Sequence, residues 1–225
     1  MIRYSEQHID YKDISSVIKT LKSDFITTGP QIQKFEEKLS KKVNSKYSVV
    51  FNSATSALHS ACIALGLKKN DWLWTSANSF VASANCGLYC GAKIDFLDIE
   101  LETFNIDLKK LEIKLHNAKK KKLLPKIIVP IVFAGQSYDR DHLIILSKKY
   151  KFKILEDASH ALGAKYKNKS VGSCRDIITV FSFHPVKMIT TGEGGSAHTS
   201  NQKYYNIMKS VSSHGIIRKK RVPRS

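Results

Sequence analysis

Short apolar segments alternate along the chain with longer segments of helical periodicity, and this alternation restricts the fold more than any other feature. Strands are expected at residues 47–51, 71–76, 93–97, 126–133, 152–155, 177–181 and 195–199. Helices are expected at residues 10–21, 31–43, 57–67, 78–89, 107–115, 139–150 and 202–211. Such alternation is typical of βαβ units. The sequence therefore predicts an α/β fold of three layers, with a mostly parallel sheet between two layers of helices.

The first two predicted helices are amphipathic. The first has an apolar stripe, and the second is expected to direct three apolar side chains inward. The stripe consists of Ile14, Val17, Ile18 and Leu21, and the inward set of Ile32, Phe35 and Leu39.

Three polar clusters follow predicted strands, where functional groups of parallel sheets gather. They are Ala54 with Thr55, residues 157–160, and residues 182–187. Asp157 follows an apolar strand, where a carboxylate needs a cationic partner. A helix N-cap or a surface ion pair would also explain this aspartate.

Residues 181–195, FSFHPVKMITTGEGG, contain one lysine, Lys187, and no arginine. A lysine amine is nucleophilic only when deprotonated, and burial beside polar groups favours that state. Gly192, Gly194 and Gly195 predict a sharp turn that passes close to another surface. The alternative is a surface hairpin with a solvated lysine.

The predicted strand 47–51 runs through the small polar loop 52–56 directly into a helix. The free N–H groups at a helix N-terminus bind phosphate, and small residues let an anion approach. An ordinary N-cap by Ser53 or Thr55 is the alternative.

The formal net charge is +18, from 37 Lys and Arg against 19 Asp and Glu. Basic runs at 119–122 and 218–221 lack interleaved aromatic residues and any nucleic-acid-binding motif. We therefore expect attraction to anionic small molecules rather than to nucleic acid.

The four cysteines indicate free thiols rather than a metal site, because Cys86 and Cys90 share a predicted helix face without further ligands at matching spacing. No segment reaches the ~20 apolar residues that span a bilayer, and the N-terminus does not resemble a signal peptide. We expect a cytoplasmic protein without membrane contact.

A lysine, an aspartate and a phosphate loop at one sheet edge are the parts that a pyridoxal-phosphate site needs. Four motifs strengthen this interpretation: FNSATSALH at 51–59, SFVASAN at 79–85, EDASHALG at 156–163, and the lysine segment. Together they resemble the DegT–DnrJ–StrS family of sugar-nucleotide aminotransferases, of fold-type I, from Tyr4 to about Arg218.

The resemblance implies a role for each matching residue. Lys187 would form the Schiff base with the cofactor aldehyde and move the proton between cofactor and sugar. Asp157 would pair with the pyridine nitrogen and keep it protonated, and His160 would lie near the phenolic oxygen. The resemblance further assigns the ring face to Phe80, the phosphate to Ala54, Thr55 and Ser182, and the sugar nucleotide to Tyr4, Asp24, Phe25, Ile26 and Thr27.

Within the family, the chain looks most like members that aminate C4 of a UDP-linked 4-keto-6-deoxy-N-acetyl hexosamine on the route to pseudaminic acid. The resemblance implies glutamate as the amino donor and a homodimer. A GDP-linked 4-keto-6-deoxy sugar as substrate, or a non-catalytic relative that binds cofactor only, are the alternatives.

The chain departs from the family pattern at its end, because the sequence stops at Ser225. Family members continue into a smaller C-terminal domain that covers one side of the cleft and contributes to the dimer. We therefore expect residues 1–217 to form the pyridoxal-phosphate-binding large domain, with 218–225 as a basic tail, and expect weak or no turnover.

Overall fold

The computed structural model describes residues 5–216, and a mixed sheet of seven strands forms its centre. The strand order is β1-β9-β8-β5-β4-β2-β3. Neighbouring strands from β8 to β3 pair in parallel, and β9 pairs antiparallel with β8 and β1. The predicted α/β fold with a mostly parallel sheet is confirmed.

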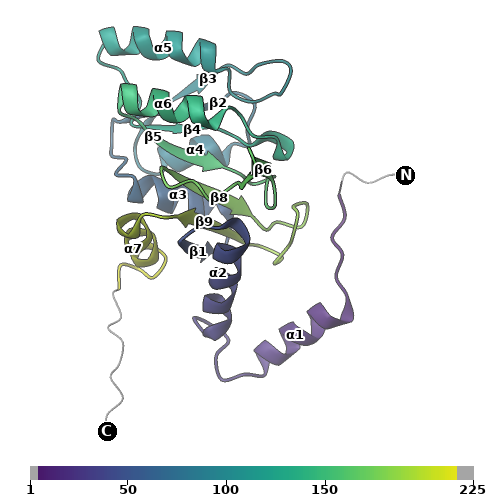
Figure 1. Ribbon diagram of the computed structural model, residues 1–225. Helices are drawn as coiled ribbons and strands as arrows, with labels where there is room; N and C mark the ends of the chain where they lie inside the picture. The colour runs from purple at the N-terminus through teal and green to yellow at the C-terminus, as the bar shows by residue number, and fades with distance from the viewer. Residues whose placement is uncertain (1–4, 217–225) are drawn as a thin grey trace.

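Most elements lie where the periodicity predicts them (Figure 1). The strands are β1 Tyr47–Phe51, β2 Trp72–Ser76, β3 Lys93–Leu97, β4 Ile127–Val129, β5 Lys153–Asp157, β8 Ile177–Ser182 and β9 Gly195–Thr199. The helices are α1 Tyr11–Leu21, α2 Pro30–Val43, α3 Ala54–Ala64, α4 Ala82–Leu88, α5 Leu108–Lys120, α6 Arg140–Tyr150 and α7 Gln202–Val211, with a 3-10 turn at Phe133–Gly135.

Side chains that cap free N–H groups decide where several helices begin. Asp107, Asp139 and Asn201 each accept a hydrogen bond from the first turn of the helix that follows. Ser53 accepts one from the Ser56 N–H, so α3 begins at Ala54 rather than at residue 57 as predicted. Pro30 opens α2, where its missing N–H removes no helical hydrogen bond.

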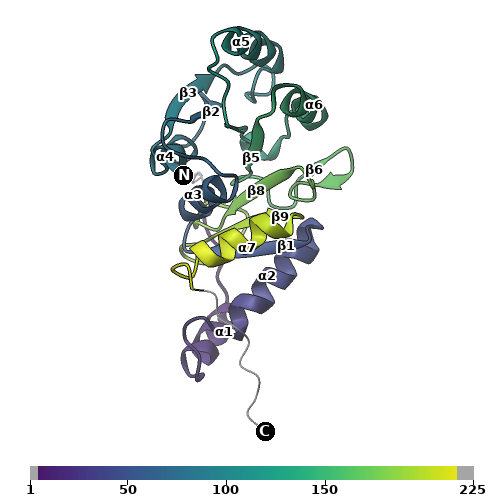
Figure 2. The same cartoon turned by 90° about the vertical axis from the view of Figure 1, so that its left-hand side faces the viewer.

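Helices cover both faces of the sheet and give two hydrophobic cores. Helices α3, α4 and α7 pack on one face around Leu58, Cys62 and Met208. Helices α2, α5 and α6 pack on the other face around Leu115 and Leu143. Figure 2 shows α4 and α6 on opposite sides of the strands. The three-layer αβα arrangement predicted from the sequence is confirmed.

Several elements differ from prediction in length, and helix α4 forms only Ala82–Leu88 of the expected 78–89. The expected strand 126–133 forms only Ile127–Val129, because Pro130 has no N–H to donate to a neighbouring strand. Helix α5 continues to Lys120. A small hairpin of β6, Lys165–Tyr166, and β7, Lys169–Ser170, was not predicted, because two-residue strands leave no periodicity in the sequence.

The apolar stripe of α1 does not reach the core. Ile14, Val17, Ile18 and Leu21 are 53%, 59%, 46% and 65% exposed, and in Figure 1 α1 stands away from the body of the domain. Ile32 on α2 is also exposed, whereas Leu39 is buried and Phe35 packs against the core. Within residues 5–216, no helix is long and apolar enough to cross a membrane.

Candidate active site

The carboxyl ends of four strands meet at one edge of the sheet. Strands β2, β5 and β8 run parallel. Strand β1 runs in the same direction as β8, because both pair antiparallel with β9. The loops after these strands therefore open at the same edge, as the sequence predicts for a parallel sheet.

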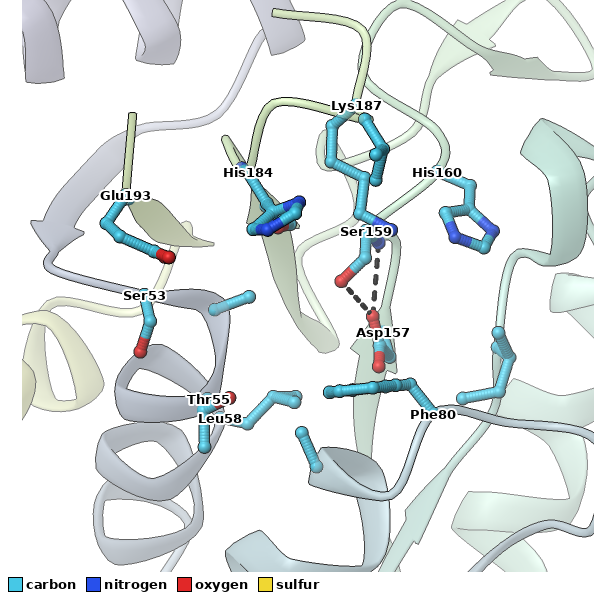
Figure 3. Close-up of a pocket in the computed structure, with 16 residues that line it drawn as sticks. Ser53, Thr55, Leu58, Phe80, Asp157, Ser159, His160, His184, Lys187 and Glu193 are labelled. Carbon is cyan, nitrogen blue, oxygen red and sulfur yellow. Dashed lines mark hydrogen bonds between the residues drawn. The ribbon is translucent and has the colours of Figure 1, made fainter. Parts of the chain in front are cut away.

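A cavity of about 440 Å³ lies at this edge, within the range of ~300–1,000 Å³ that small-molecule sites occupy. Figure 3 shows side chains from several strand ends pointing into it. Its lining includes Ser53, Ala54, Thr55, Leu58, Phe80, Ala82, Ile131, Asp157, Ser159, His160, Ser182, His184, Val186, Lys187, Glu193 and Gly194. The predicted residues Lys187, Asp157, His160, Ser182, Ala54, Thr55 and Phe80 are all in this set.

Asp157 is the last residue of β5 and is 5% exposed. Oδ1 accepts hydrogen bonds from the Ser159 hydroxyl at 2.6 Å and the Ser159 N–H at 3.1 Å. Oδ2 accepts one from the Ser83 hydroxyl at 2.6 Å. Donors to both oxygens fix the orientation of the carboxylate.

Lys187 lies in the loop after β8 and faces the same cavity as Asp157 (Figure 3). Burial lowers the pKa of its amine, and the negative charge of Asp157 opposes that shift in part. No ion pair within 4.0 Å joins the two side chains. The amine is therefore more available in its neutral, nucleophilic form than a fully solvated lysine would be.

The glycine segment after Lys187 brings strand β9 against the start of α3. A Cβ built on Gly195 would lie 2.4 Å from the Ala54 backbone nitrogen, so this contact requires glycine. Gly192 has a φ of +75°, which favours glycine for a different reason. The predicted sharp turn and close approach are both confirmed.

The start of α3 presents free donors to the cavity. Ala54 and Thr55 are its first two residues, and the N–H groups of a first helical turn have no partner within the helix. The buried Ser182 at the end of β8 also lines this side of the cavity. These groups together form an arrangement that suits an anion.

Two ring side chains border the cavity near Asp157. Phe80 is 74% exposed, so its ring face is open to a planar partner. Burial, with a smaller contribution from the Lys187 charge, lowers the pKa of His160. Its imidazole is therefore neutral at pH 7 and has one N–H donor and one acceptor nitrogen.

The residues expected to contact a sugar nucleotide are not brought to this cavity. Asp24, Phe25, Ile26 and Thr27 are exposed in the connection between α1 and α2 and are not among its lining. The physical reason is that α1 buries no side chain that could hold this connection against the domain. Tyr4 lies outside the described residues.

Several lining or supporting residues were not singled out from the sequence. Ser159 could have been found, because an Asp followed two residues later by Ser is a common local hydrogen-bonding pattern. His184 and Glu193 lay within the lysine segment without an assigned role. Ser83 comes from α4 and lies 74 residues before Asp157, so only the fold relates them.

A buried polar network lies behind Asp157. Glu156 is 0% exposed and accepts hydrogen bonds from the Tyr138 hydroxyl at 2.8 Å and the Thr179 hydroxyl at 2.9 Å. The guanidinium of Arg140 lies 3.1 Å from the same carboxylate. Burial raises the pKa of Tyr138, which therefore remains a hydroxyl donor. The network ties β5 to β8 and α6, and thereby fixes the strand that carries Asp157.

The cysteines and the basic run near the C-terminus were also singled out from the sequence. Cys62 and Cys86 are buried, Cys90 and Cys174 are partly exposed, and all four are free thiols. Among the described residues, no group of three or more His, Cys, Asp or Glu is arranged to hold a metal ion. The basic run 218–221 lies outside residues 5–216.

The cavity matches pyridoxal phosphate group by group. It offers an amine of lowered pKa for an aldehyde, a fixed carboxylate for a pyridine nitrogen, and free N–H groups for a phosphate. The exposed ring of Phe80 complements a flat heterocycle. The residues present therefore fit this cofactor.

Comparison with known proteins decides the family. The model of the DegT/DnrJ/EryC1/StrS aminotransferase family matches residues 7–224. The chain belongs to this family. Aminotransferases of the DegT family depend on pyridoxal phosphate, and both a PLP form and a PMP form of Spr1654 from Streptococcus pneumoniae, assigned as a sugar aminotransferase, resemble this chain.

Individual proteins show which members of the DegT family this chain resembles. The UDP-4-amino-4,6-dideoxy-N-acetyl-beta-L-altrosamine transaminase of Campylobacter jejuni serotype O:23/36 is 45% identical over 98% of this chain. PseC of Helicobacter pylori, an aminotransferase involved in the biosynthesis of pseudoaminic acid, has a TM-score of 0.86 and 36% identity over 97% of this chain. The PLP form of Spr1654 has a TM-score of 0.85 and 33% identity over 95% of it.

The chain spans a little over half of these DegT-family proteins. It covers 57% of the Campylobacter transaminase, 57% of PseC and 58% of Spr1654. The predicted family and fold-type I architecture are thus confirmed over the described domain.

Proposed function

We propose that this chain binds pyridoxal 5′-phosphate in the Lys187 cavity and serves the transfer of an amino group from glutamate to C4 of a UDP-linked 4-keto-6-deoxy-N-acetyl hexosamine. The supporting observation is that an amine of lowered pKa and a doubly anchored carboxylate face one cavity beside the start of α3. The 45% identity to the Campylobacter transaminase supports the choice of sugar.

The binding roles follow from the chemistry of each side chain. The first-turn N–H groups of Ala54 and Thr55, with the Ser182 hydroxyl, bind the phosphate. The Asp157 carboxylate accepts a hydrogen bond from the protonated ring nitrogen, and Phe80 stacks on the ring. His160 is neutral at pH 7, and its one N–H group donates a hydrogen bond to the phenolic oxygen of the cofactor.

When bound, pyridoxal phosphate supplies an aldehyde that condenses with amines and a ring that accepts an electron pair. Lys187 would hold the cofactor through its amine. In the first half of the cycle the same amine would move a proton from the donor carbon to the cofactor, and in the second half it would move a proton from the cofactor to C4 of the sugar. Its lowered pKa suits a group that must both lose and regain a proton.

The proposal extends to the domain bounds, the oligomeric state and the location of the protein. Residues 1–217 form the cofactor-binding domain, the active form is a homodimer, and the protein works in the cytoplasm on an anionic nucleotide sugar. The +18 charge suits a substrate that carries a diphosphate. The connection 24–27 and Tyr4 are proposed to contact that substrate.

The first experiment tests cofactor attachment. Pyridoxal 5′-phosphate is added to the purified chain, the absorbance of the bound cofactor is followed, and borohydride reduction with peptide mass spectrometry locates the modified lysine. We expect a pyridoxyl group on Lys187 and none in Lys187→Ala. Attachment spread over surface lysines, unchanged in that variant, would overturn the proposal.

The second experiment tests the reaction. The loaded chain is treated with glutamate and then with the UDP-linked 4-keto sugar, and the amino sugar is detected by mass spectrometry. A GDP-linked 4-keto-6-deoxy sugar serves as the competing substrate. Product from the GDP sugar alone would change the assigned substrate, and cofactor binding without product from either would reduce the function to cofactor binding.

A further inference from the structure

Ser83 on helix α4 donates a hydrogen bond to the Asp157 carboxylate, which lines the cavity. Its side chain is 0% exposed, and its hydroxyl lies 2.6 Å from Oδ2. This distance is within the ~2.5–2.7 Å typical of a hydroxyl that donates to an ionised carboxylate. The contact joins segments 74 residues apart in the sequence.

Each of the two carboxylate oxygens of Asp157 has its own hydrogen-bond donor. Ser159 donates to Oδ1 through its hydroxyl and its N–H, and Ser83 donates to Oδ2. A carboxylate rotates about its bond to Cβ, so donors on one oxygen alone do not fix its plane. Since Asp157 is 5% exposed, water has little access to replace a lost donor.

Ser83 also fixes the backbone that carries Phe80. The Ser83 N–H donates to the Phe80 carbonyl at 3.0 Å, in the turn that leads into α4. One residue therefore contacts both the carboxylate and the segment whose ring borders the cavity. A displacement of this turn would change the orientation of the carboxylate and the position of the ring together.

We propose that Ser83 is a positioning residue that orients the Asp157 carboxylate toward the ring nitrogen of the bound cofactor. The inference rests on the proposed function, because it concerns how pyridoxal phosphate is recognised. Without the Ser83 hydroxyl, Oδ2 has no hydrogen-bond donor from residues 5–216, and the carboxylate can turn away from the ring nitrogen.

The test measures recognition of the ring nitrogen rather than activity. Dissociation constants are determined for pyridoxal 5′-phosphate and for its 1-deaza analogue, in which CH replaces the ring nitrogen. The ratio of the two constants reports the Asp157 contact. We expect Ser83→Ala to reduce this ratio at least about fivefold, because loss of a hydrogen bond to a charged group weakens what that group recognises.

Matched variants separate positioning from a general loss of structure. Ser60 on α3 is 1% exposed and its hydroxyl has no hydrogen-bond partner within residues 5–216, so Ser60→Ala removes a buried hydroxyl without touching Asp157. We expect its ratio to stay within about twofold of the parent, Ser83→Thr to retain the ratio, and Asp157→Asn to abolish discrimination. If Ser83→Ala does not fold, Ser83→Cys, with its weak donor, takes its place.

The outcomes distinguish this inference from the proposed function. A parent chain that does not bind pyridoxal 5′-phosphate, or binds both compounds equally, overturns the proposed cofactor site and this inference with it. A second outcome is that the parent prefers pyridoxal 5′-phosphate to the 1-deaza analogue, that Asp157→Asn abolishes this preference and that Ser83→Ala preserves it. This outcome overturns the role of Ser83 alone. Equal weakening of both compounds by Ser83→Ala indicates a structural role only and also overturns it.

Discussion

Asp157 and Lys187 face one cavity because the strands that carry them are hydrogen-bonded neighbours. Asp157 ends β5, Lys187 follows β8, and the register pairs Asp157 with Val180, two residues before the end of β8. The two charged groups remain separate, since the carboxylate is already held by Ser83 and Ser159. This arrangement holds the Asp157 carboxylate in a fixed orientation while the Lys187 amine faces the same cavity.

The lowered pKa of Lys187 predicts modification at a lower pH than for a free lysine. Reductive alkylation with formaldehyde should reach half its maximal rate at Lys187 below the ~10.4 expected of N-acetyl-lysine amide, since burial disfavours the charged amine. Asp157→Asn should lower this midpoint further, because the Asp157 charge raises the pKa of Lys187. Peptide mass spectrometry across a pH series measures both, and a higher midpoint in Asp157→Asn would contradict the assigned coupling.

The buried histidine of β9 predicts a loss of stability in acid. His198 is 0% exposed between the Ser45 and Ser196 hydroxyls, and burial lowers its pKa to about 3 from 6.5. The unfolded chain binds this proton first, so stability is complete above pH 6.5 and falls as the pH decreases toward 3, by up to about 1.4 kcal/mol per pH unit from this group.

Urea unfolding at several pH values between 6 and 4.5 measures that slope. His198→Gln should flatten it, because glutamine does not titrate, whereas His116→Gln, at an exposed position, should leave it unchanged. Equal slopes in the parent and His198→Gln would contradict the prediction.

The network behind Asp157 predicts a large stability cost when its charges are unbalanced. Glu156→Gln leaves the buried Arg140 without a counter-charge and should lower the free energy of unfolding by about 3–5 kcal/mol. Combining it with Arg140→Met removes both charges and should recover much of the loss. Glu112→Gln breaks an exposed pair with Lys149 and should have little effect in the same denaturation assay.

The close contact of Gly195 with α3 predicts that a single methyl group disturbs the proposed phosphate site. Gly195→Ala would bring a Cβ within 2.4 Å of the Ala54 nitrogen, so β9 or the start of α3 must shift. We expect the dissociation constant of pyridoxal 5′-phosphate to rise by about tenfold, or about 1.4 kcal/mol. Gly192→Ala meets no atom within 4 Å and should affect stability through its φ of +75° while binding changes less.

Periodicity and local motifs were sufficient for most elements because their signals are local. Strands β1, β3 and β9 and helix α7 have the predicted bounds, and the stripe of α1 gives a helix of nearly the predicted length. The stripe did not reveal that α1 remains exposed. Amphipathicity shows that one face of a helix is apolar, but it does not show what that face contacts. The short hairpin 165–170 was missed for lack of any repeating pattern.

By itself, the sequence determined the α/β class, the positions of Asp157 and Lys187 at or beyond the ends of strands, and the glycine turn at 192–195, because each depends on residues adjacent in the chain. Tertiary structure alone decided that Ser83 donates to Asp157, that Gly195 contacts Ala54, and that Arg140 neutralises Glu156. Those contacts join segments from different layers or strands of the domain. No local pattern encodes them, because they arise only when the helices pack onto a sheet of fixed strand order.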